Sequence, residues 1–148
     1  ILVNFRLQIS TSKKEETMSC LCELIQHADW KTEKHVPVIE APTETAAGEN
    51  IKICVSVGKE VPHPNKTEHH IRWITVYFKP DDGKFPVQIG QVEFCAHGES
   101  VEGPDKSGIY AAPCAAVCFK TDKPGTIIAT SYCNIHGLWE SCKELKIK

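Results

Sequence analysis

The chain has 148 residues, of which 41% are hydrophobic and 24% are charged, and its formal net charge is −2. This length suits one domain with a substantial core, and the composition is ordinary for a soluble globular protein. The small net charge gives no reason to expect nucleic acid or an anionic membrane as a partner. No apolar run approaches the ~18 residues that are needed to cross a bilayer.

The first residues are expected to lie outside the folded part. Residues 10–19 are polar, and residues 1–9 are mildly apolar but lack the basic start and small-residue cleavage site of a signal peptide. Met18 is the only methionine, so it is one candidate for the native start, with the residues before it as an appended tail; a native segment is the open alternative. We predict a disordered or appended tail over residues 1–18 and a single domain over residues 19–148.

Eight cysteines at first suggest a disulfide framework, but they are scattered through apolar stretches of a chain long enough to fold without cross-links. Without an export signal we expect a cytoplasmic location, a reducing environment and mostly free thiols. Most of these cysteines are then expected to pack as small buried hydrophobic residues. Cys20 and Cys22 lie close together but have no second pair, so we interpret them as incidental.

One short helix followed by short strands is predicted along the chain. Leu21, Leu24, Ile25 and Ala28 follow helical spacing, which predicts a helix over about residues 19–27. Alternating or β-branched stretches predict an extended strand within residues 29–40 and strands over 51–57, 71–78, 87–94, 115–119, 126–132 and 143–147.

The arrangement of these strands is also partly predictable. Residues 71–78 are apolar on both faces, as in a central strand, and the apolar phase of residues 87–94 switches at Gly90, which indicates a β-bulge. Residues 41–50 and 98–108 have the composition of loops. About seven short strands separated by turn signals predict an all-β sandwich.

Histidines in loops and one cysteine form the strongest chemical signal. Cys133 and His136 are three residues apart after an apolar run, so one tight turn presents sulfur and nitrogen to a single metal ion. His63 and His69 flank one loop, and His35 belongs to a third connection. Because loops cluster at one end of a sandwich, these four imidazoles and one sulfur are the candidate ligands.

The type of metal follows from this set of ligands, with alternatives left open. Structural zinc usually takes four ligands with paired Cys-x-x-Cys spacing, which is missing here. Blue copper uses two histidines, one cysteine and a weak axial ligand, which leaves two histidines unused. Four imidazoles with an axial thiolate suit iron and leave one octahedral position open.

Other residues are interpreted as structural. A single loop histidine is most often a surface residue, and this applies to His27 and His97. His70 is next to His69 and would point the other way in an extended segment, so we interpret it as a non-ligand. The three tryptophans are expected to pack in the core or at its rim.

Several motifs resemble those of the superoxide reductases, most of all the one-iron neelaredoxin type. They occur in family order as EKHVPVI at 33–39, HP and HHIR within 63–72, AHGES at 96–100 and SYCNIHGLW at 131–139. The resemblance runs from about Ala28 to Glu144. The related two-iron desulfoferrodoxins carry an added rubredoxin-like centre held by four cysteines. Because only two cysteines precede the main domain here, that centre is expected to be absent.

The resemblance implies an immunoglobulin-like, seven-stranded β-sandwich with a short N-terminal helix. It implies one iron ion (Fe2+/Fe3+) per chain, held equatorially by four imidazoles and axially by a thiolate; these ligands are His35, His63, His69, His136 and Cys133. It further implies a homotetramer and an external electron donor, rubredoxin or a similar small redox protein.

The reaction implied is the one-electron reduction of superoxide to hydrogen peroxide. Lys34 is expected to attract the anion and place a proton-bearing water, and Glu33 to be a sixth ligand of the oxidised state. A solvated ion pair is the plain alternative for these two residues. In a straight extended segment Glu33 and His35 share one side while Lys34 faces the other, so the segment has to bend.

The turn over residues 134–137 is expected to support the Cys133 sulfur, because its backbone N–H groups can donate hydrogen bonds to it.

Three competing functions stay open. They are a cupredoxin-like electron carrier without a substrate, a structural zinc module, and superoxide dismutase activity at the same iron.

Overall fold

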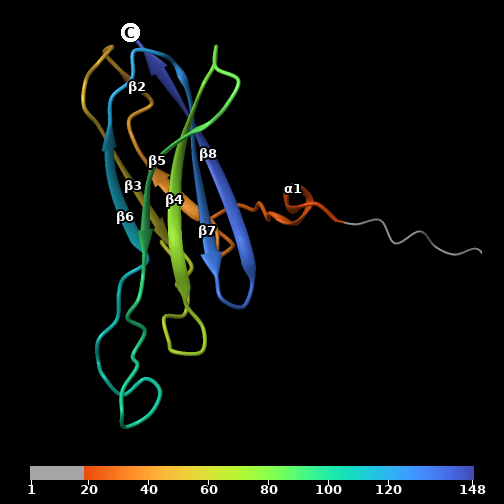
Figure 1. Ribbon diagram of the computed structural model, residues 1–148, viewed down its shortest axis with the longest axis vertical. Helices are drawn as coiled ribbons and strands as arrows, with labels where there is room; N and C mark the ends of the chain where they lie inside the picture. Colours follow the sequence, from red (N-terminus) through yellow and green to blue (C-terminus); the bar gives the residue numbers. More distant parts are fainter. Residues whose placement is uncertain (1–18) are drawn as a thin grey trace, which may run out of the picture.

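The computed structural model describes residues 19–148, so the tail predicted over 1–18 lies outside the described residues. Within the described range the chain forms one helix, α1 (Leu21–Leu24), and eight strands (Figure 1). The strands are β1 (Pro37–Glu40), β2 (Glu44–Thr45), β3 (Ile51–Val57), β4 (Ile71–Pro80), β5 (Val87–Glu93), β6 (Cys114–Phe119), β7 (Gly125–Cys133) and β8 (Gly137–Ile147). No helix of residues 19–148 is long and apolar enough to span a membrane.

The strands form two sheets that pack face to face. One sheet has the order β1-β3-β6, and the other has the order β2-β8-β7-β4-β5. Every pairing is antiparallel except that of the two-residue β2 with β8. The predicted all-β, immunoglobulin-like sandwich is therefore confirmed, and β4 lies inside its sheet, as its two apolar faces indicated.

Alternating side chains of the two sheets meet in the core. In β3 the four inward residues are at most 5% exposed, and in β7 every second residue is buried. Burying one such Val or Ile side chain stabilises the fold by ~1.5–3 kcal/mol. The inward row of β7 ends at Cys133, whose exposure is 0%. The alternation that builds the core thus also fixes the direction of this sulfur.

The bulge predicted at Gly90 is confirmed. Val76 pairs with Gly90 but Tyr77 pairs with Gln88, so one extra residue of β5 has no partner on β4. A Cβ atom at Gly90 would lie 2.8 Å from Cγ1 of Val117 on the other sheet. A larger residue would therefore push β5 away from β6.

The structure also differs from the sequence prediction at three elements. Helix α1 covers four residues rather than 19–27, because Leu21 and Leu24 are 59% and 56% exposed and find no surface to stabilise further turns. Strand β8 begins at Gly137 instead of 143, because the tight turn after Cys133 returns the chain directly to the β7 ladder. Strand β2 lies within the stretch predicted to be a loop.

The prediction that most cysteines are buried is wrong, although all eight are free thiols as expected. Six are exposed, Cys54 is intermediate and Cys133 is buried. Cys114 and Cys118 show the reason, because the alternation of β6 places them on its outward phase, opposite the outward residues of β3. The apolar composition of a stretch does not reveal which phase of the strand faces the core.

Candidate metal centre

Three connections at one end of the sandwich carry the five candidate ligands. The turn before β1 supplies His35, the β3–β4 loop supplies His63 and His69, and the β7–β8 turn supplies Cys133 and His136 (Figure 1). In each sheet, antiparallel pairing brings these ends together, since β1 starts where β3 ends and β4 starts where β7 ends. The predicted convergence of distant loops is what the fold provides.

The four imidazole rings lie at the corners of a rough square. Ring centroids are 4.6 Å apart for His35 and His136, and 4.9 Å apart for His136 and His69. They are 4.7 Å apart for His69 and His63, and 4.8 Å apart for His63 and His35. The diagonal from His35 to His69 is longer, at 6.1 Å. Four rings in this cyclic order fit the binding of one metal ion.

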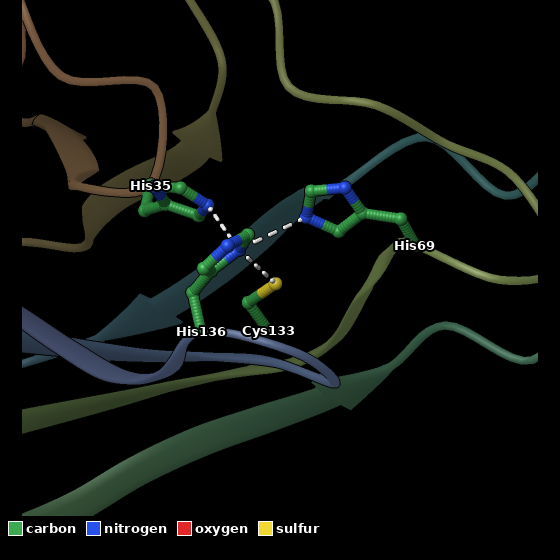
Figure 2. Close-up of side chains that lie close together, drawn as sticks. All are labelled: His35, His69, Cys133 and His136. Atoms are coloured by element: carbon green, nitrogen blue, oxygen red, sulfur yellow. Dashed lines mark hydrogen bonds between the residues drawn. The ribbon is translucent and has the colours of Figure 1, made fainter.

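Donor atoms of His35, His69, His136 and Cys133 point at one another (Figure 2), and His63 is not part of this group. Nδ1 of His136 lies 3.0 Å from Nε2 of His35, 3.2 Å from Nε2 of His69 and 3.7 Å from Sγ of Cys133. The donor atoms of these four residues all lie within 4.8 Å of one another. A ring nitrogen has one proton or one lone pair, so hydrogen bonds cannot satisfy all three contacts at once, whereas a shared cation can.

His63 gives independent support for a metal. Its Nδ1–H donates to the Pro64 carbonyl oxygen at 2.6 Å, which leaves a lone pair on Nε2. That Nε2 is buried and has no hydrogen-bond partner. An unpaired buried polar atom costs about 1–3 kcal/mol, and a metal ion in the square would remove this penalty. The residues present therefore fit a metal ion.

Neighbouring groups hold the rings in place. Nδ1 of His35 lies 2.6 Å from a carboxylate oxygen of Glu33, and its ring stacks on Trp139 at 5.0 Å between centroids. The carbonyl oxygen of His136 accepts hydrogen bonds from Gln26 at 2.9 Å and from Trp139 at 3.3 Å. Histidines that bind metals usually donate their second N–H to a carboxylate or carbonyl group, as His35 and His63 do.

Burial favours the neutral form of three of the candidate ligands, His35, His63 and His69. It is the largest cause that lowers the pKa of His35, His63 and His69, and the pKa of His63 falls to about 4. The positive charge of Lys34 lowers all three values further. Neutral imidazole is the form that binds a metal ion, so these three rings need not release a proton to bind one at pH 7.

The segment before β1 bends, as the positions of Glu33 and Lys34 required. The N–H groups of Thr32 and Glu33 both donate to the Asp29 carbonyl oxygen, which makes a turn. Burial alone would raise the pKa of the Glu33 carboxyl group, but its hydrogen bonds from His35 lower the net pKa. Glu33 binds the Nδ1 side of that ring, and its role as a sixth ligand stays a prediction.

Three histidines lie outside the square. His70 and His97 stack on each other with centroids 3.5 Å apart, and His27 is exposed, with Nε2 3.9 Å from Glu140. The expectation of a surface residue is met by His27 but is wrong for His97, which is 3% exposed because its ring packs against His70. That all three are non-ligands stays a prediction. The Asn134 N–H donates to the His70 carbonyl oxygen. The expectation that it donates to the Cys133 sulfur is therefore wrong for this N–H group.

Sequence reasoning missed the contacts of Trp139 and Gln26 with the ligands. For Trp139 the signal was present, because it follows His136 by three residues on a strand that returns beside β7. Its side chain therefore lies back over the turn. Nothing in the sequence pattern connects Gln26 with His136, which is 110 positions away.

A β-sandwich whose loops gather four imidazoles and one buried cysteine sulfur defines a protein with a His/Cys metal centre. Known proteins identify the class more closely. The Desulfoferrodoxin family model matches residues 27–142. The superoxide reductase of Pyrococcus furiosus is 57% identical over 82% of this chain and 95% of its own length, and the neelaredoxin of Megalodesulfovibrio gigas is 50% identical over 86% and 98%.

Solved structures agree with this relationship. The superoxide reductase (neelaredoxin) of Archaeoglobus fulgidus in the reduced form superimposes with a TM-score of 0.78 at 55% identity, over 84% of this chain and 99% of that one. The chain belongs to the desulfoferrodoxin family.

Proposed function

We propose that this chain is a superoxide reductase that holds one iron ion and reduces superoxide to hydrogen peroxide with an external electron. The residues that would hold it are His35, His63, His69, His136 and Cys133. The observation that carries the proposal is the square of imidazoles beside a buried sulfur, together with the buried Nε2 of His63 that has no hydrogen-bond partner. Relatives named superoxide reductase at 50–57% identity support the same reaction.

Iron bound by four imidazoles and a thiolate supplies a one-electron couple and an open coordination position. The protein side chains determine access to it. Cys133 is buried and closes the cluster from the core side, whereas His69 is intermediate and His136 exposed. A small anion would therefore approach from the solvent side of the plane.

Lys34 is the proposed residue for attracting superoxide. After burial, its positive charge is among the causes that lower the pKa of His35, His63 and His69, and the same charge would attract an anion bound among these rings. A unit charge about 4 Å away at an effective dielectric constant near 20 contributes roughly 4 kcal/mol before screening. The ammonium group would also hold the water that delivers a proton to the reduced oxygen. Glu33, whose carboxylate contacts the His35 ring, is proposed as the sixth ligand of the oxidised iron.

The electron is proposed to come from rubredoxin or a similar small redox protein. Among residues 19–148 the four-residue group around His136 is the one cluster of three or more metal-binding side chains. A second metal centre that could supply the electron therefore has no such group of ligands within residues 19–148, which supports an external donor. We also propose a homotetramer and a cytoplasmic location, on the basis of the family resemblance.

The metal content and visible spectrum of the oxidised protein test this proposal. We expect iron, a thiolate–iron charge-transfer band and, with reductant present, one peroxide formed per superoxide consumed. Cys133→Ala should abolish the band and the activity. Cys142→Ala, at an exposed thiol on β8, is the matched control and should keep both.

Two results would contradict the proposal. Full occupancy by copper or zinc, together with an iron-loaded form that consumes no superoxide, would favour an electron carrier or a structural zinc module. One peroxide formed per two superoxide ions, unchanged by added reductant, would instead identify a dismutase.

A further inference from the structure

The Asn134 side chain connects two of the segments that carry candidate ligands. Its Oδ1 accepts a hydrogen bond from the His70 N–H at 2.8 Å, and its Nδ2–H donates to the Glu68 carbonyl oxygen at 2.8 Å. Its backbone N–H donates to the His70 carbonyl oxygen at 3.1 Å. One residue of the β7–β8 turn thus makes three bonds to the end of the β3–β4 loop.

These bonds explain how β7 can end directly after Cys133. The last pair of the β4–β7 ladder is Ile71 with Cys133. In the next position the side-chain oxygen of Asn134 takes the place of a backbone carbonyl as the acceptor for the His70 N–H. The backbone is therefore free to turn toward His136, while the N–H of a residue that is only 5% exposed stays paired.

The two partners of the amide group lie on either side of His69. The Glu68 carbonyl precedes His69 and the His70 N–H follows it, so both peptide groups beside this ligand are attached to the residue after Cys133. Two other side chains of this loop bind elsewhere: the Asn65 amide donates to the Ala111 carbonyl oxygen, and the Thr67 hydroxyl donates to Asp105.

We propose that Asn134 is a positioning residue of the metal centre, whose amide group fixes the His69 imidazole relative to the Cys133 sulfur. The inference rests on the proposed function only in that both residues are metal ligands. Loss of the amide lets the His69 segment move away from the thiolate. Metal affinity and the geometry of the metal–sulfur bond then change together.

The test compares Asn134→Ala, which removes both side-chain bonds, with Asn134→Asp. The aspartate keeps the acceptor for His70 but turns a second oxygen toward the Glu68 carbonyl, where the amide donates. Gln91→Ala is the matched control, because this amide is bonded to Thr75 and Glu93, away from the candidate ligands. Each protein is loaded with Co²⁺, titrated with a chelator, and its thiolate-to-metal charge-transfer band is recorded.

We expect Co²⁺ affinity to fall by about 10–100-fold in Asn134→Ala, by less in Asn134→Asp, and not in Gln91→Ala. The charge-transfer band should shift in the same order. Unchanged affinity and band position in Asn134→Ala overturn the inference, as does a lower Tm with an unshifted band, because that result shows a purely structural role. If Asn134→Ala does not fold, wild-type affinity and band position in Asn134→Asp overturn it.

The outcome is independent of turnover. A wild-type protein that binds Co²⁺ with a thiolate band but reduces no superoxide contradicts the proposed function and leaves the role of Asn134 to be decided by the variants. A wild-type protein whose Co²⁺ complex lacks the thiolate band contradicts both.

Discussion

Two groups of histidines lie side by side at one end of this sandwich and differ in where their nitrogens point. In the square formed by His35, His63, His69 and His136, nitrogens face one another or, for Nε2 of His63, face no partner. In the stacked pair, Nδ1 of His70 faces the Lys66 carbonyl oxygen. Nδ1 and Nε2 of His97 face oxygens of Asn65 and Phe94.

The difference separates the proposed ligands from the histidines interpreted as structural without reference to the metal. Both groups are close-packed, and burial lowers the pKa of members of each, as the values for His63 and His97 show. Proximity and pKa therefore do not distinguish them. What distinguishes them is that the square contains ring nitrogens that meet another imidazole or, for Nε2 of His63, no partner, whereas Nδ1 of His70 and both nitrogens of His97 face oxygens.

The largest expected effect follows from removing one member of each group. His63→Ala should lower iron affinity by more than about 100-fold, because substitutions that only support a ligand already cost about 10–100-fold. His97→Ala should change it by only a few-fold, because its ring binds other loops. Competition with a chelator measures both. Equal losses in the two variants would show that the unpaired Nε2 of His63 does not mark a ligand.

Stability should respond in the opposite order. His97→Ala removes hydrogen bonds to Asn65 and Phe94 and a stacking partner from a site that is 3% exposed. We expect a loss of about 2–3 kcal/mol in the free energy of unfolding of the metal-free protein. His63→Ala removes an unsatisfied nitrogen and should cost less. Urea unfolding of both metal-free variants measures these losses. A larger loss of unfolding free energy in His63→Ala than in His97→Ala would contradict the comparison.

The sequence allowed much of this end of the molecule to be predicted. Alternating or β-branched residues predicted strands over 51–57 and 126–132, and the loop positions of His35, His63 and His69 suggested convergence. The ring orientations could not be predicted, because they depend on acceptors distant in sequence, such as the Phe94 carbonyl for His97 or Glu33 for His35.

The exposed cysteines show the same limit from another side. Composition suggested burial for most of them, yet the phase of β6 places Cys114 and Cys118 outward. Which phase faces the core is decided by pairing with β3, a strand about 60 positions earlier in the chain. Local pattern predicts that a strand forms, and tertiary pairing decides what it exposes.

A smaller effect is expected in the pH dependence of the metal-free protein. Above pH 6.5 His63 is neutral in both the folded and the unfolded chain. Between about pH 6.5 and 4 the unfolded chain binds a proton that the folded chain does not, because burial lowers the folded pKa to about 4. Stability should therefore fall as the pH falls through this window, by about 1–2 kcal/mol after allowance for solvent screening.

Urea unfolding at pH 7 and pH 4.5 measures this loss, and His63→Ala should make it smaller. The pKa values of His35 and His69 are also lowered, so part of the dependence should persist in the variant. Stability that rises on acidification would show that these imidazoles become protonated in the folded state, contrary to the burial of the square.

The smallest effect concerns the charges that act on each group. Lys34 lowers the pKa of His35, His63 and His69, whereas Arg72 lowers that of His97. Lys34→Ala should raise the pKa of the first three imidazoles and leave the pKa of His97 unchanged. Arg72→Ala should raise the pKa of His97 and leave the pKa values of the other three unchanged. Histidine NMR titrations of the metal-free protein measure both variants. If Lys34→Ala moves only His97, the Lys34 ammonium group does not face the square, and the proposed attraction of superoxide loses its structural basis.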